Sequence, residues 1–157
     1  MPSTALHNAI AEKASLAQVL HLIEYSPQSI EEKDQFGKTP LRIACQSNAS
    51  LEIVSLLLQK YPDATRKKDI GANTPLHQAC NHPKSSCHIV ALLLEKYPDA
   101  IKQKNTFGNT PFDLACQSYA PSEVISLLLT KNPNVLKNTD DVGNTPLHSA
   151  FDYEAPL

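Results

Sequence analysis

The sequence predicts an all-α solenoid of stacked helix-turn-helix units joined by β-turn or hairpin fingers, and three recurring features lead to this prediction. A Thr-Pro dipeptide recurs in steps of 35, 36 and 35 residues. Each of its threonines is followed by an apolar residue after two positions and by an alanine after five, and is preceded by another proline 12 residues earlier. A fixed period of this size is typical of stacked structural repeats. The four dipeptides are Thr39-Pro40, Thr74-Pro75, Thr110-Pro111 and Thr145-Pro146.

The first helix of each unit is expected to begin at the Thr-Pro dipeptide. Threonine caps a helix N-terminus well, and proline suits the first helical position because its missing N–H would have no partner there. In the second unit, the short apolar stretch 40–45 then forms the helix. Its central Ala44 is small enough to let the helix of the next unit approach closely.

The second helix of each unit carries a longer apolar string. In the second unit it is expected to begin after Ser50 and to bury Ile53, Val54 and the leucines of 56–58. The proline that follows disfavours helical geometry in the residue before it, so these helices should end near Tyr61, Tyr97 and Asn132.

An extended stretch is expected to lead from the second helix into an Asp-x-x-Gly turn. Glycine tolerates positive φ, which such tight turns require. All four glycines of the chain lie two or three residues before a repeat threonine, and they are Gly37, Gly71, Gly108 and Gly143. No glycine remains for a phosphate-binding loop.

In this pattern the chain resembles the ankyrin repeat, whose motif is Asp-x-x-Gly-x-Thr-Pro-Leu-His-x-Ala. Residues 140–150 match that motif, and residues 69–79 match it except that Gly71 stands one place early. The resemblance implies an ankyrin-repeat solenoid in a single domain. The repeats of this chain are a variant with a period of 35 or 36 residues, in place of the usual 33, and with a Tyr-Pro-Asp-Ala stretch after the second helix. The expected units are 1–33, 34–68, 69–104, 105–139 and a half unit 140–157.

The histidine of the motif is present in some units and replaced in others. In the ankyrin family, the motif threonine and histidine hydrogen-bond to each other and help to join adjacent repeats. His77 and His148 can do this, as can His7 in an imperfect first copy, whereas Arg42 and Asp113 occupy the same position and cannot do it in the same way. Their two repeats have either another partner or a locally weaker structure.

The resemblance also implies a function. Related ankyrin proteins hold other proteins on the concave surface formed by finger tips and first helices, so we expect a non-catalytic scaffold for protein–protein interaction. Phe36, Ile70, Phe107 and Val142 would form an apolar row along the tips; alternatively, they pack on the neighbouring turn. The candidate partner-binding residues are Gln35, Phe36, Lys38, Gln46, Ile70, Asn73, Asn81, His82, Thr106, Phe107, Asn109, Gln117, Asp141, Val142 and Asn144.

Metal-binding and catalytic chemistry find little support in the sequence. Cys45, Cys80 and Cys116 each follow the alanine of the repeat and so occupy the same position in successive first helices. Helices that pack about 8–10 Å apart hold these cysteines too far apart for disulfides. We therefore expect them to be small buried residues. Zinc ligation by Cys80, His82, Cys87 and His88 is a weaker alternative, because their spacing matches no standard zinc motif. Since no catalytic or dinucleotide motif is present either, we expect no enzyme activity, no cofactor and no metal.

Composition and charge narrow the possible partners. The 157 residues carry a net charge of −2, which disfavours nucleic-acid binding, and the longest apolar run, Ile89–Leu94, is too short to span a membrane. The charge is −3 over residues 1–34, +5 over 35–104 and −4 over 105–157, so the basic middle either steers an acidic partner or is simply a solvated edge.

Three features of the sequence bear on where the protein is found in the cell and on whether the chain is part of a larger protein. The unpaired cysteines and the lack of a signal-like N-terminus favour an intracellular protein, cytoplasmic or nuclear. Phe151, Tyr153 and Leu157 make a poor polar cap, which suggests truncation or a covering partner. Two rival functions remain, which are end-to-end self-association through the C-terminal end and a regulatory segment of a larger, possibly enzymatic protein.

Overall fold

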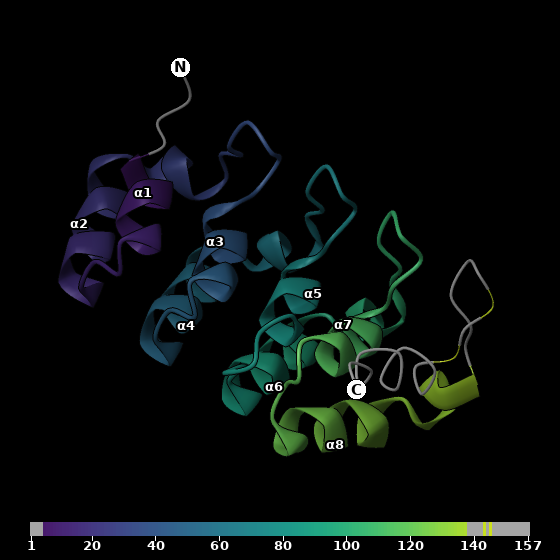
Figure 1. Cartoon of the computed structure of the whole chain (residues 1–157). Coiled ribbons are helices and arrows are strands. Elements are labelled where there is room, and N and C mark those ends of the chain that lie inside the picture. Colours follow the sequence, from purple (N-terminus) through teal and green to yellow (C-terminus); the bar gives the residue numbers. More distant parts are fainter. Residues whose placement is uncertain (1–4, 138–142, 144, 146–157) are drawn as a thin grey trace, which may run out of the picture.

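The computed structural model of the chain describes residues 5–137, 143 and 145. Within these residues the structure contains eight α-helices and no strand. The helices come in four pairs, each pair being one repeat, and the pairs stack along the molecule (Figure 1). Their bounds are α1 Ala5–Ala11, α2 Leu16–Tyr25, α3 Pro40–Gln46, α4 Leu51–Lys60, α5 Pro75–Cys80, α6 Cys87–Lys96, α7 Pro111–Gln117 and α8 Ser122–Lys131.

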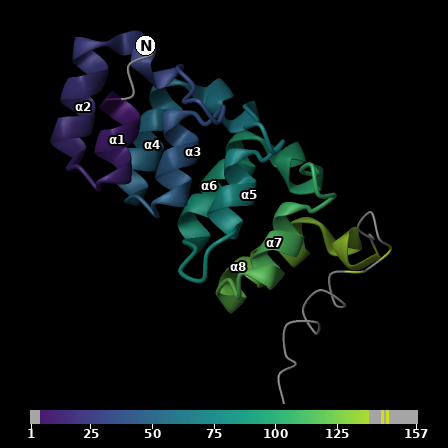
Figure 2. The ribbon, with the colours of Figure 1, turned by 45° about the horizontal axis from the view of Figure 1, so that its top comes forward.

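The helices form two parallel layers. The first helices α1, α3, α5 and α7 pack against one another in sequence, and the second helices do the same beneath them (Figure 2). The core runs continuously between the layers, because each repeat buries its apolar face on the next. Ala44, Ala79 and Ala115 are buried where successive first helices meet, as the phase of the repeat predicts.

Local capping confirms where the helices begin and end. Thr39, Thr74 and Thr110 each accept a hydrogen bond from the backbone N–H three residues on, with proline at the first helical position. Ser50 caps α4, as predicted, and Ser86 caps α6 in the same way. The second helices end one residue before Tyr61, Tyr97 and Asn132.

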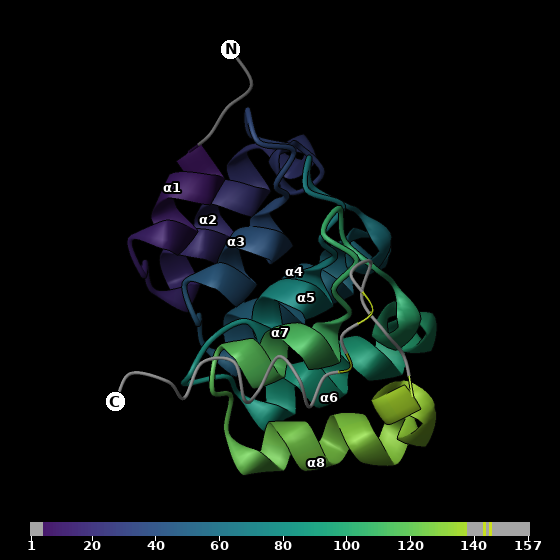
Figure 3. The ribbon, with the colours of Figure 1, turned by 45° about the vertical axis from the view of Figure 1, so that its right-hand side comes forward.

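The segment after each second helix differs from the prediction, because it is a 3₁₀ helix and not an extended stretch. Proline fixes φ near the helical value and favours the first turn of a helix, which explains why the chain turns again immediately. The 3₁₀ helices are η1 Pro27–Ile30, η2 Pro62–Arg66, η3 Pro98–Lys102 and η4 Pro133–Lys137. They lie along one edge of the stack, on the right in Figure 3.

The prediction of positive φ holds at three of the four glycines and is wrong at one. Gly37, Gly108 and Gly143 have φ of 73°, 78° and 89°. Gly71 does not adopt positive φ; instead Ala72 has φ of 57°. Because Gly71 stands one place early, the left-handed position of this finger falls on the alanine. Pro146, His148 and the rest of the predicted half unit lie outside the described residues.

Candidate binding surface

Within the described residues, three fingers, at residues 34–38, 69–73 and 105–109, project from the stack between successive helix pairs (Figure 1). Each is closed by the same set of hydrogen bonds. In the first finger the backbone amide of Asp34 donates to the carbonyl of Lys38 at 2.9 Å, and a carboxylate oxygen of Asp34 accepts from the amides of Phe36 and Lys38. Asp69 and Asn105 close the other two fingers with corresponding side-chain contacts. The sequence shows this recurring polar residue, but not that its side chain organises the whole tip.

Neighbouring fingers are bonded directly to each other. The amide of Ile70 donates to the carbonyl of Phe36 at 3.2 Å, and that of Thr106 donates to the carbonyl of Gly71 at 3.0 Å. The side-chain amide of Asn105 adds a 3.0 Å contact to the side-chain oxygen of Asn73. The fingers are therefore one connected structure and not three independent loops.

The tips of these fingers expose apolar side chains. Phe107 and Ile70 are 76% and 73% exposed, so most of each side chain is open to solvent. Phe36 is 46% exposed, and the Lys38 ammonium lies 5.3 Å from the centre of its ring. Val142, the fourth residue of the predicted row, lies outside the described residues, as do Asp141 and Asn144.

The remaining predicted binding residues lie at the bases of the fingers and on the first helices. The side-chain oxygen of Gln46 accepts from the Lys38 ammonium at 3.0 Å, and the Gln117 amide donates to the Asn109 side chain at 3.4 Å, so two first helices are tied to their own fingers. At the corresponding C-terminal end of α5, Asn81 is exposed and follows the helix directly. The two other predicted tip residues, Gln35 and Thr106, are exposed, and His82 is half-buried.

Repeats are joined beneath the fingers by side chains in the histidine position of the motif. His77 is fully buried; its Nδ1 accepts from the Thr74 backbone amide at 3.2 Å, which leaves Nε2–H to donate to the carbonyl of Asn109 at 3.2 Å in the next repeat. His7 makes the same contact with the carbonyl of Lys38 at 2.9 Å. The contact to the next repeat is thus present at both His7 and His77. The expected bond between the motif threonine and histidine is present at His77, where the Thr74 hydroxyl and Nδ1 lie 2.8 Å apart, whereas Thr4 lies outside the described residues.

The two replacements in this position have found other partners. The Arg42 guanidinium reaches across to the Asp69 carboxylate at 2.9 Å, and both side chains are almost completely buried. Asp113 accepts from the backbone amide and the hydroxyl of Thr110, both at 2.7 Å, and so completes a capping box. Of the two alternatives left open by the sequence, the structure supports a new partner in each case.

Burial controls the chemistry of the titratable groups in this region. Burial lowers the pKa of His77 to about 4, although the Asn109 carbonyl favours the charged form. Burial acts against ionisation at Asp69 too, but hydrogen bonds from Asn73 and the nearby Arg42 charge outweigh it, and the pKa of Asp69 is lowered. A neutral histidine and a charged aspartate therefore lie side by side as structural links.

The cysteines are thiols. Cys45 and Cys80 are buried as predicted, whereas Cys116 and Cys87 are half-buried. Burial raises the pKa of the Cys45 thiol to about 12 and that of Cys116 to about 11. Among the described residues no group of three or more potential metal ligands comes together, and this includes the four residues of the alternative zinc site.

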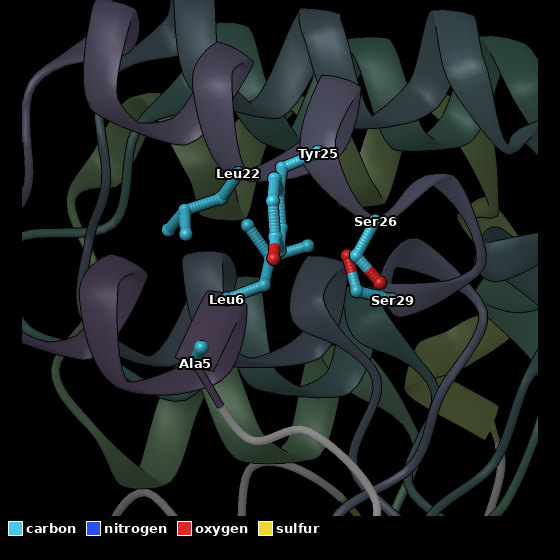
Figure 4. Close-up of a pocket in the computed structure, with 6 residues that line it drawn as sticks. All are labelled: Ala5, Leu6, Leu22, Tyr25, Ser26 and Ser29. Carbon is cyan, nitrogen blue, oxygen red and sulfur yellow. The ribbon is translucent and has the colours of Figure 1, made fainter.

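The N-terminal end of the stack carries a separate apolar hollow of about 340 Å³ between α1, α2 and η1. Figure 4 shows Leu6, Leu22 and Tyr25 around it, with Ser26 and Ser29 at one side. Tyr25 is 85% exposed. Among the described residues, those that line the hollow include no cluster of ionisable side chains.

A family comparison agrees with the architecture. The sequence model for ankyrin repeats in three copies matches residues 6–104 and, in a second alignment, residues 76–156. The chain belongs to the ankyrin-repeat family. A comparison with curated proteins finds no match.

Ankyrin repeats are in general modules for protein–protein interaction and are typically not enzymes. The chain's stacked helices and fingers therefore belong to a family that binds protein partners. None of the helices in the described part of the chain is long and apolar enough to cross a membrane.

Proposed function

We propose that the protein is a non-catalytic scaffold that binds a protein partner through its finger tips and first helices. The exposure of Ile70 and Phe107 on adjacent bonded fingers carries this proposal. Large apolar side chains that stand in a row on a fixed frame are suited to act as interface anchors.

The connections between fingers explain how such a surface would bind. Backbone hydrogen bonds fix the separation of Phe36, Ile70 and Phe107 before any partner arrives. Binding then costs little loop-ordering entropy, because the tips do not have to be organised during docking. The polar side chains of Lys38, Asn73 and Asn109 at the bases would form the hydrated rim around these anchors.

Affinity capture with matched variants tests the proposal. We expect a partner retained by the wild-type chain to be lost from the double variant Ile70→Ser, Phe107→Ser, because both anchors are removed from one surface. The control is Leu16→Ser, Leu51→Ser, which removes two leucines that are 42% and 38% exposed at the starts of α2 and α4. A partner that survives the finger variant and is lost from the control would contradict the proposed surface.

A second candidate is self-association through the N-terminal end of the stack. Leu22 is half-buried, whereas its counterparts Leu57, Leu93 and Leu128 are covered by the preceding repeat. No described repeat covers Leu22, and the adjacent Tyr25 enlarges the apolar face. Light scattering distinguishes the two candidates, since a mass that stays monomeric at rising concentration removes self-association.

A further inference from the structure

Basic residues recur in and next to the 3₁₀ helices η2, η3 and η4. These helices lie along one edge of the stack (Figure 3). The basic residues occupy three positions of the repeat, which lie 14, eight and six residues before the repeat threonines. Each position is filled by an exposed lysine or arginine in three successive repeats. The three sets are Lys60, Lys96 and Lys131; Arg66, Lys102 and Lys137; and Lys33, Lys68 and Lys104.

The charge is concentrated on this edge and is not a general property of the chain. Residues 60–68, 95–104 and 131–137, here called the basic edge, carry nine basic and three acidic side chains, whereas the whole chain has a net charge of −2. The first repeat contributes Lys33 alone, because Tyr25 and Glu31 stand at the positions of Lys60 and Arg66. The Lys33 ammonium donates to the backbone carbonyl of Lys68 at 3.0 Å. The positive charge of this edge is therefore concentrated in the second, third and fourth repeats.

Aromatic rings position two of these cations. The Arg66 guanidinium lies 4.5 Å from the centre of the Tyr97 ring, which comes from the next repeat, and the Lys67 ammonium lies 6.0 Å from the Tyr61 ring. A cation held over an aromatic face loses less side-chain freedom when it meets an anion than an unrestrained one. The neighbouring Lys96 pairs with Glu95 at 3.0 Å in an exposed contact, which contributes little and is easily exchanged.

An apolar groove of about 500 Å³ lies beside the basic edge. Leu94 of α6, Ile101 of η3 and Leu127 of α8 form its apolar part, and Lys131 and Glu95 border it. The groove can receive an aliphatic side chain from a ligand that also contacts the lysines. Apolar and cationic contacts are thus available to one ligand at the same time.

We propose that the basic edge binds an extended acidic segment of a partner protein, with an aliphatic residue of that segment in the groove. Successive repeats place equivalent cations about 10 Å apart, since packed helices are separated by about 8–10 Å. An extended chain advances about 3.3 Å per residue, so aspartate or glutamate at every third position matches this spacing. The basic edge is distinct from the finger tips, and either surface can function without the other.

The charge distribution favours an acidic peptide over a nucleic acid. Duplex DNA carries one negative charge per roughly 1.7 Å of its length. Equivalent cations of the basic edge are about 10 Å apart, so the charge density of DNA is far higher than that of this surface. Asp63, Glu95 and Asp99, which interrupt the basic edge, suit a ligand whose own charges are spaced apart.

Fluorescence anisotropy with a synthetic peptide tests this proposal. The probe is a labelled 12-residue peptide with glutamate at every third position and one central leucine, and its partner control has glutamine in place of each glutamate. We expect saturable binding of the acidic peptide at about 50 mM salt that weakens as salt rises, and no binding of the glutamine peptide. Replacement of the leucine by serine should also weaken binding.

Charge-matched variants locate the site. Arg66→Glu, Lys102→Glu should reduce the affinity for the acidic peptide about tenfold or more, whereas Lys13→Glu, Lys84→Glu makes the same change in net charge at other exposed lysines and should have a much smaller effect. Equal losses in both variants, or no binding by wild type, would overturn the proposal. So would tighter binding of a single-stranded oligothymidine of equal length or of phosphatidylserine vesicles. The finger variant Ile70→Ser, Phe107→Ser should still bind the acidic peptide. Binding by this variant shows that the basic edge and the finger surface are tested independently.

Discussion

Acidification should weaken the stack through His77, because this side chain is buried in its neutral form. The folded state resists protonation until pH falls to about 4, whereas the unfolded chain takes up the proton near 6.5. Between these values the unfolded state binds more protons, so stability present above pH 6.5 is lost as pH falls towards 4. The contribution of Asp69 is also lost on acidification, but only below its ordinary pKa of 3.8.

The size of the effect follows from the two pKa values. Linkage gives a loss of about 2 kcal/mol between pH 7 and pH 4.5 for this one group. His77→Gln should remove that part of the pH dependence, since glutamine does not titrate. His21→Gln, at an exposed histidine, is the matched control and should leave it unchanged.

Urea unfolding followed by circular dichroism at several pH values measures this contribution. As pH falls from 7 to 4.5, the free energy of unfolding should decrease by the same amount in wild type and in His21→Gln. In His77→Gln the decrease should be smaller by about 2 kcal/mol. Equal slopes for all three proteins would refute the assignment of a buried neutral histidine as the main acid-sensitive link.

Three further predictions concern other links in the stack. Gly37→Ala should lower the free energy of unfolding by about 1–2 kcal/mol in urea titrations, because φ is 73° there and an added Cβ would lie 3.3 Å from a backbone nitrogen of the next finger. Asp69→Ala should cost about 3 kcal/mol in the same assay, since it leaves the Arg42 guanidinium buried without its partner. Iodoacetamide on the native protein should alkylate Cys87 well before Cys45, whose burial raises its thiol pKa to about 12; mass spectrometry showing the reverse order would contradict the burial pattern.

The parts of the fold that local chemistry decides were predictable from sequence. Thr39 and Pro40 specify a helix start without reference to any distant residue, and the proline at 62 sets where α4 must end. The same proline also begins a 3₁₀ helix where an extended stretch was predicted, because proline both ends one helix and favours the first turn of the next. The shift of positive φ from Gly71 to Ala72 was missed because the glycine itself lies one place early.

Contacts between repeats were less predictable, since they depend on how one repeat aligns with the next. The pairing of Arg42 with Asp69 joins residues 27 apart and requires the finger of the third repeat to lie against the first helix of the second. The exposure of Phe107 also depends on which way the tip turns, so sequence left it open whether the residue is free or packed. The distribution of net charge along the sequence did indicate a basic middle. Arg66, Lys102 and Lys137 end η2, η3 and η4, and only the stacking of the repeats brings these 3₁₀ helices to one edge (Figure 3).

Site-specific crosslinking from the finger tip tests the central claim most directly. A photo-crosslinking amino acid in place of Phe107 should form a covalent product with the protein partner on irradiation, and the same amino acid in place of Leu51 should not. A product formed from position 51 and absent from position 107 would contradict a binding surface at the fingers.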